Sequence, residues 1–349
     1  VRLSHSHIRI GTFQRLLALE AAEEMEQLID YCLANFPGPP PPEDAPGRDE
    51  PAVILLHQVV ERLADMAAGY MVAGFVHGVL NTDNMNVTGE SFDYGPWRWL
   101  PRFDPLFTAA YFDHAGLYAY GRQPTAIHWN CGQLAVALRL LADAPPLIAA
   151  LDRFGPLFNA ALARRFCWRL GVEPQGTEAD LALLAAAEHH MAEADLSPDR
   201  FHWRHRAGRD APEGELRERL AGYRPTAAID DPLWRAEGPV TNHIDEVERI
   251  WAAIDQRDDW SPLHDHVAAI RVLGATLGPA PVPSEIAIVM SFLPVFVDVM
   301  INLPSEPRDA VASGHRPAAA VGRRGVPGRP ARGRRAVPRR GIAVRRFRR

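Results

Sequence analysis

The sequence predicts a mainly α-helical protein with a small β element, an α+β chain in which helices dominate. Alanine, leucine and glutamate are abundant, and these residues favour helices. Apolar residues recur at three- and four-residue intervals over most of the chain. One interval, residues 82–105, instead alternates turn-forming residues with Val87, Phe92 and Trp97, which is typical of a hairpin.

The first predicted elements are two helices separated by a loop. Residues 12–35 carry apolar side chains on one helical face and predict an amphipathic helix. Residues 36–51 hold too many prolines for the interior of a helix or strand and predict a surface loop. Residues 52–80 predict a long buried helix leading directly into the turn-rich interval. Glu61 and Arg62 lie inside that helix and exclude a membrane span there.

The turn-rich interval, residues 82–105, predicts a short hairpin or a pair of turns, with the β element within residues 82–96. We expect this arrangement to place Asp83 and Asp93 at one end of the long helix, facing the same open cleft. From Ile127 the helical periodicity resumes, interrupted by a pair of adjacent prolines, and further helices are expected to about residue 278.

Charge separates the body of the chain from its end. No acidic residue follows Asp309, whereas thirteen arginines lie between Arg316 and Arg349. Without those thirteen, the 38 basic residues become 25 against 43 acidic ones, a balance that favours solubility and disfavours nucleic acid. The chain contains no lysine, and arginine in its place, with abundant Ala, Gly and Pro, is typical of a GC-rich bacterial gene.

Residues 279–349 differ in composition from the rest, so we expect residues 1–278 to form the folded region and residues 279–349 a disordered tail. Residues 285–304 are apolar but interrupted by a proline and an aspartate, which disfavours a membrane span. The following Arg-, Gly- and Pro-rich residues offer too little apolar surface to fold. We interpret the tail as out-of-frame or read-through translation. Nucleic-acid binding is the alternative, disfavoured because only Phe347 could stack on a base.

Asp83, Asn84 and Asp93 are the main candidate site residues of the turn-rich interval. Short oxygen-bearing side chains are the ligands that hard cations such as Mg²⁺ prefer. The same residue types are also the commonest in turns, because their side chains bond their own backbone. Spacing alone leaves both interpretations open and favours plain turn chemistry.

Histidines and cysteines give weaker signals. Four histidines lie close together in the sequence: His189, His190, His202 and His205. Zinc sites usually need two close ligand pairs at fixed spacing. A single His-x-x-His is a weak signal, so we disfavour a metal site there. Three cysteines lie far apart: Cys32, Cys131 and Cys167. They argue against a disulfide framework and favour a reducing, cytoplasmic location, as does an N-terminus without a signal-peptide pattern.

Six short motifs occur in the order and spacing of one protein family. They are SHIRIGTFQ, GFVHGVLNTDNM, DYGP, FDP, GLYAYGRQP and HWN, which begin at residues 6, 74, 93, 103, 116 and 128. On these motifs, residues 1–278 resemble the selenoprotein O family of kinase-like protein adenylyltransferases. The resemblance implies the large lobe of a protein-kinase-like fold with extra helices. It also implies Mg²⁺-dependent transfer of AMP from ATP to Ser, Thr or Tyr hydroxyls of proteins.

The resemblance assigns roles to five residues. Asp83 matches the catalytic aspartate, which accepts the hydroxyl proton. Asn84 and Asp93 match the ligands of Mg²⁺, with Mn²⁺ as an alternative, and Asp93 also contacts ATP. Arg2 and Arg9 match arginines that bind ATP phosphates, a task that suits a permanently charged, forked side chain. Nucleotidyl transfer asks mainly for positioning and charge neutralisation, and these residue types provide both.

The chain also departs from the family pattern. Family members carry a glycine-rich loop and an ATP-contacting lysine ahead of the first matched arginine, and some carry a redox residue near the C-terminus. Neither feature occurs here, so we expect the small lobe to be missing and the chain to be truncated. The implied partners are ATP and hydroxyl-bearing proteins, without a membrane. The alternative is a non-catalytic helical fragment or interaction protein with a basic, nucleic-acid-binding tail.

Ring residues near the motifs receive no chemical role from the resemblance: we interpret the histidines as packing or capping residues, and the tyrosines and the tryptophan as core aromatics. They are His5, His7, His77, Tyr118, Tyr120, His128 and Trp129.

Removing residues 310–349 is predicted to leave the thermal midpoint of the body nearly unchanged. Ordering each residue costs about 1–2 kcal/mol, and an Arg-Gly-Pro-Ala sequence buries little apolar surface to offset that cost. Differential scanning calorimetry of the two chains checks this. A drop of many degrees on truncation would show that the tail is an integrated part of the fold.

Overall fold

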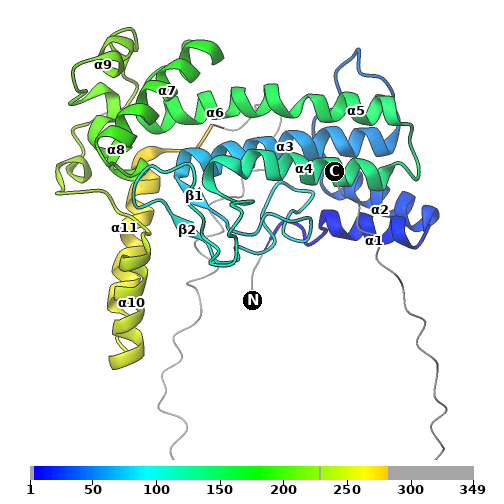
Figure 1. Cartoon of the computed structure of the whole chain (residues 1–349), viewed down its shortest axis with the longest axis horizontal. Coiled ribbons are helices and arrows are strands. Elements are labelled where there is room, and N and C mark those ends of the chain that lie inside the picture. Colours follow the sequence, from blue (N-terminus) through cyan, green and yellow to red (C-terminus); the bar gives the residue numbers. More distant parts are fainter. Residues whose placement is uncertain (1–3, 228, 282–349) are drawn as a thin grey trace, which may run out of the picture. The chain divides into compact units, whose positions relative to one another are not determined.

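A computed structural model describes residues 4–227 and 229–281 of the chain and shows a mainly helical protein with one two-stranded sheet (Figure 1). The helices are α1 (Ile10–Ala18), α2 (Ala22–Asn35), α3 (Pro51–Ala73), α4 (Gln123–Leu138), α5 (Ala144–Asp152), α6 (Phe154–Leu170), α7 (Thr177–Glu193), α8 (Pro198–His205), α9 (Glu215–Leu220), α10 (Ile244–Arg257) and α11 (Ser261–Leu277). The predicted class, mainly α with a small β element, is confirmed. Arg2 and the predicted tail beyond residue 281 lie outside the described residues.

Helix α3 is the centre of the larger hydrophobic core. Its apolar side chains are buried almost all round, as expected for a helix covered on several sides. It packs against α2, α4, α5 and α6, and Figure 1 shows it running between α4 and α6. A second core joins the C-terminal half of α6 to α7, α8 and α9 around Phe166 and Phe201.

The sheet follows α3 directly. Strand β1 (Phe75–Val76) pairs antiparallel with β2 (Arg98–Trp99). The β element predicted within residues 82–96 is therefore misplaced, because the paired strands flank that interval. Inside it, a single bridge between Met85 and Ser91 closes a small hairpin. The chain thus leaves β1, forms the hairpin and returns through β2.

Two sequence-based boundaries are wrong in position, and the interruption at the proline pair is confirmed. The single helix predicted for residues 12–35 is two helices, because Glu20 has φ of 53° and interrupts the helical path. The helix predicted for residues 52–80 ends at Ala73, where Gly74 adopts a left-handed conformation and caps it. The proline pair at residues 145–146 marks the first turn of α5, where proline is tolerated, after a break in the helical path.

Charged residues on α3 are buried and paired. Asp65 accepts hydrogen bonds from Arg165 and Arg164 of α6. Arg62 donates to the carbonyls of Phe36, Pro37 and Val87. These bonds fix α6 and two connecting segments onto the central helix. Within the described ranges, none of the helices combines the length and continuous apolar character that crossing a bilayer requires.

Several histidines are buried and held neutral. His57 accepts a hydrogen bond from Arg153 at 2.8 Å, and burial together with that cation lowers its pKa to about 4. His205 lies beside the Arg209 carbonyl at 3.2 Å, and burial lowers its pKa to about 4 as well. Burial also lowers the pKa of His202. Among the described residues, no group of three or more His, Cys, Asp or Glu side chains is placed to hold a metal ion.

These histidines predict acid lability. Below their ordinary pKa of 6.5 the unfolded chain protonates His57 and His205, while the folded chain leaves them neutral down to about 4. The unfolded state then binds more protons, so the free energy of unfolding falls as pH falls through that window, by roughly 1–2 kcal/mol per histidine at about pH 5. Urea unfolding near pH 7 and pH 5 measures this loss.

The matched variants for this test are His205→Gln and His189→Gln. His205→Gln is expected to remove part of the pH-dependent loss. His189→Gln replaces an exposed histidine paired with Glu193 and is expected to leave the loss unchanged. An equal pH dependence in wild type and His205→Gln would contradict the assignment.

Candidate functional site

A hairpin brings Asn84 and the segment before Asp93 together. The Phe92 N–H donates to the Asn84 carbonyl at 2.9 Å, and the Asn86 N–H donates to the Glu90 carbonyl at 2.9 Å. Asn84 therefore lies directly across the hairpin from Phe92, the residue before Asp93. Two of the three candidates named from the sequence, Asn84 and Asp93, therefore lie close together on paired backbone segments.

Asn84 and Asp93 each use one polar side-chain atom in a hydrogen bond with the backbone. The Asn84 amide nitrogen donates to the Val79 carbonyl at 2.8 Å, which orients the amide and leaves its oxygen able to accept. One carboxylate oxygen of Asp93 accepts the Gly95 N–H at 2.7 Å, a turn that leaves the second oxygen for another partner. One amide oxygen and one carboxylate oxygen form a donor set that fits a hard cation such as Mg²⁺.

Asp83 lies beside the start of α1. The Ile10 N–H donates to the Met85 carbonyl at 3.0 Å, and the Gly11 N–H donates to the Thr82 carbonyl at 3.1 Å. Helix α1 is thereby docked onto the loop that carries Asp83. A Cβ added at Gly11 would lie 2.4 Å from a carboxylate oxygen of Asp83, so glycine is what allows this approach.

Arg9 links the catalytic candidate to the hairpin. Its guanidinium nitrogen lies 4.0 Å from the Asp83 carboxylate, and its guanidinium carbon lies 4.4 Å from the centre of the Phe92 ring. The Arg9 backbone also bridges Asn86. The Asp83 side chain is 68% exposed, so this ion pair is screened by water and contributes little stability. Arg9 therefore remains available to an anionic ligand.

His77 is a positioning residue that the sequence interpretation treated only as packing. It is fully buried, and its Nδ1 accepts the Val79 N–H at 3.2 Å. That bond places the ring proton on Nε2, which donates to the Asp93 carbonyl. The His77 N–H in turn donates to the Gln123 side chain at 2.9 Å. Asp93 is thus anchored through His77 to α4, a link that residue spacing does not reveal.

The other ring residues mostly match their packing interpretation. Tyr120 is buried and donates to the Met71 carbonyl at 2.6 Å, and His128 stacks on Phe154. Trp129 differs, because it lies on α4 with 58% of its surface exposed, so its assignment to the core is wrong.

A family model described as "Protein adenylyltransferase SelO" matches residues 1–209. A "Protein nucleotidyltransferase YdiU" from Gloeobacter violaceus is 35% identical over 295 residues, covering 78% of this chain and 60% of the relative. Proteins of the same name from Synechococcus elongatus and Rhodopseudomonas palustris are 44% and 33% identical, covering 50% and 76% of this chain and 34% and 58% of those relatives. The chain therefore spans less than two thirds of the length of these curated relatives.

Replacing His77 is predicted to loosen the Asp93 turn. In His77→Phe the Asp93 carbonyl and the Val79 N–H lose their partners inside the protein, at a cost of about 1–3 kcal/mol in the free energy of unfolding. Urea unfolding measures that loss, and amide hydrogen exchange at Gly95 is expected to become faster. His128→Phe is the matched control, because it replaces a stacked exposed ring without removing a hydrogen bond to the site. Equal effects of the two changes would refute the anchoring role.

Proposed function

The chain belongs to the protein adenylyltransferase SelO family, and on that premise we propose that it carries the metal- and phosphate-binding part of a protein adenylyltransferase. The substrates would be ATP and the Ser, Thr or Tyr hydroxyls of cytoplasmic proteins. We further propose that the described helices correspond to the large lobe of a kinase-like fold. The curated relatives are longer than this chain, so the activity of the whole protein is part of the proposal.

One observation carries this proposal. The hairpin and the start of α1 bring together the segments that carry Asn84, Asp93, Asp83 and Arg9, through the Asn84–Phe92 backbone bond, the Arg9–Asp83 ion pair and the contact of Arg9 with the Phe92 ring. Nucleotidyl transfer requires positively charged groups and a carboxylate base at the same site. A cation must neutralise the phosphate oxygens, a second positive group must hold the phosphate chain, and a base must accept a proton.

Asn84 and Asp93 would hold Mg²⁺, or Mn²⁺ as an alternative. When bound, the cation would neutralise phosphate oxygens of ATP and orient them for attack. The two residues supply the amide oxygen and the second carboxylate oxygen that backbone hydrogen bonds leave in place. His77 keeps the Asp93 backbone fixed, so the position of the carboxylate is set before any ligand arrives.

Asp83 would act as the base. Its exposed carboxylate can reach a substrate hydroxyl without opening the core. As the hydroxyl oxygen bonds to the α-phosphorus, the bond from that phosphorus to the bridging oxygen breaks and pyrophosphate leaves. The hydroxyl proton passes to Asp83.

Arg9 would bind the phosphates of ATP. Its stacking against Phe92 holds the guanidinium near the hairpin while its charge faces outward to solvent and Asp83. A forked, permanently charged group suits phosphate oxygens. Arg2, which lies outside the described residues, is proposed for the same task on the strength of the family resemblance.

The test is transfer of AMP from ATP radiolabelled in its α-phosphate, with β-casein as the acceptor protein. Wild type is expected to label protein in the presence of Mg²⁺ and not of EDTA. Asp93→Ala and Asp83→Asn are each expected to lower the labelling rate by about 100-fold or more, because each removes a group required in the transition state. Asp259→Asn is the matched control, an exposed aspartate that also accepts the N–H two residues on.

A second variant tests whether the position of the Asp83 carboxylate, rather than its presence alone, controls the rate. Gly11→Ala is expected to displace the Asp83 carboxylate and lower the rate with little change in stability, because an exposed side-chain end can move aside. Gly132→Ala, where an added Cβ meets nothing within 4 Å, is its control. Labelling that persists in Asp93→Ala would refute the metal role. Wild-type labelling that is absent with Mg²⁺ and with Mn²⁺ would favour a non-catalytic interaction protein.

A further inference from the structure

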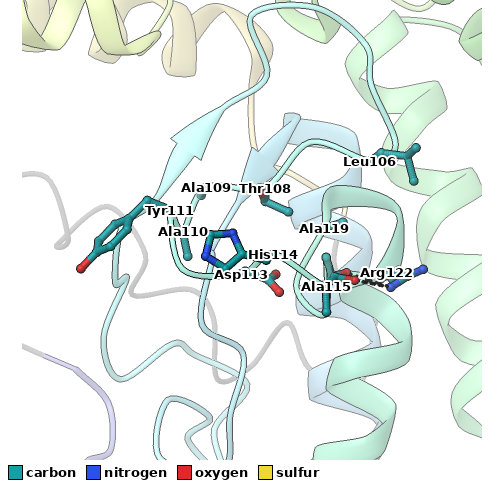
Figure 2. Close-up of a pocket in the computed structure, with 11 residues that line it drawn as sticks. Leu106, Thr108, Ala109, Ala110, Tyr111, Asp113, His114, Ala115, Ala119 and Arg122 are labelled. Carbon is teal, nitrogen blue, oxygen red and sulfur yellow. Dashed lines mark hydrogen bonds between the residues drawn. The ribbon is translucent and has the colours of Figure 1, made fainter.

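Large apolar side chains are exposed on one short segment that follows the candidate site. Leu106 is 74% exposed, Tyr111 90%, Phe112 53% and Leu117 57%. Leu106 and Tyr111 border a cavity of about 610 Å³, and Figure 2 shows them at the two ends of the group of lining residues, with the Tyr111 ring pointing away from the rest. Apolar side chains exposed together in this way mark a surface that binds something.

This segment is built rather than loose. The two carboxylate oxygens of Asp113 accept the N–H groups of Leu117 and Tyr118, each at 2.8 Å. Arg122 donates to the carbonyls of Ala115 and Gly116 at 3.0 and 3.2 Å, bonds drawn in Figure 2. These bonds fix the backbone of residues 113–122, and the apolar side chains that the segment exposes would gain free energy when a partner covers them.

The cavity adjoins the candidate site. A Cβ added at Gly78 would lie 3.1 Å from the Ala109 Cβ, which lines the cavity, and 2.9 Å from Pro96. Gly78, Ala109 and Pro96 are therefore packed together. Pro96 ends the turn that begins at Asp93. The cavity wall at Ala109 is thus packed, through Gly78 and Pro96, against the turn that would hold the cation.

The charges of the cavity disfavour a nucleotide as its occupant. Arg122 and His114 lie in its wall, and one guanidinium nitrogen of Arg122 already donates to two backbone carbonyls. Asp113 would repel phosphate oxygens. The exposed side chains are aliphatic and aromatic, which suits the side chains of a polypeptide.

We infer that this cavity and its apolar rim, residues 106–122, dock an extended segment of the target protein that carries a large apolar side chain close to the accepting hydroxyl. The inference relies on the proposed function for the hydroxyl-bearing partner. The apolar side chain of the target would pack against Leu106 and Tyr111. Docking there would place the neighbouring hydroxyl beside the Asp93 turn.

Fluorescence anisotropy without ATP tests the docking directly. Two short fluorescein-labelled peptides with one central serine are compared, one with Leu and Phe flanking the serine and one with Gly at those places. The Leu/Phe peptide is expected to bind the full chain about 10-fold more tightly. Tyr111→Ser and Leu106→Ser are each expected to weaken its binding about 5- to 10-fold. Trp251→Ser is the matched control, an apolar ring on α10 that is 61% exposed.

The outcomes separate this inference from the proposed function. Asp93→Ala is expected to bind the Leu/Phe peptide like wild type while losing AMP transfer, and that result supports the docking surface independently of catalysis. Equal binding of the two peptides, or no effect of Tyr111→Ser, overturns the inference while AMP transfer by wild type still supports the function. Loss of ATP binding in Tyr111→Ser, or conversion of a dimer to a monomer by that change, overturns it in favour of a nucleotide or a second copy.

Discussion

The buried guanidinium of Arg62 is the constraint on which the site depends. A cation inside a hydrophobic core is costly unless acceptors surround it, and burial lowers the pKa of Arg62 accordingly. Its acceptors are carbonyls: Phe36 at 2.9 Å, Pro37 at 2.8 Å and Val87 at 3.2 Å. Val87 belongs to the hairpin segment that begins at Asn84. The central helix therefore holds the hairpin through a buried charge, so the core sets the position of the exposed candidate residues on that hairpin.

Rigidity at the site is built from the inside outwards. His77 is fully buried and anchors the Asp93 backbone, while Gln123 of α4 holds His77 and also donates to the Phe75 carbonyl at 2.8 Å. Helix α1 is docked on the same loop through backbone bonds to Met85 and Thr82. Positioned groups lose little entropy when a ligand binds, so a rigid, buried support is the physical requirement for exposed groups that must act together.

The sequence predicted more of the fold class than of its boundaries. Helical periodicity identified α3, α7 and the later helices, because burial of an apolar face repeats along the chain. It missed the break at Glu20, since neither glycine nor proline marks it, and it ran α3 past Ala73, since the left-handed cap at Gly74 is followed by more apolar residues. Motif resemblance named the candidate site residues. The contacts of His77 and Arg62 could not be predicted, because they join segments far apart in the chain and carry no local signal.

The sequence left open whether Asn84 and Asp93 are turn residues or cation ligands, and their hydrogen bonds make the two roles compatible. By contrast, both carboxylate oxygens of Asp113 accept backbone N–H groups, so Asp113 acts as a turn residue only. One oxygen of Asp93 accepts the Gly95 N–H, and the amide nitrogen of Asn84 donates to the Val79 carbonyl. Each keeps one oxygen atom, held in place by the bond that its other polar atom makes. A carboxylate with both oxygens bonded to the backbone has none left for a cation, and a carboxylate with neither oxygen bonded can rotate freely. Partial commitment to the backbone is therefore the arrangement that a preorganised cation ligand requires.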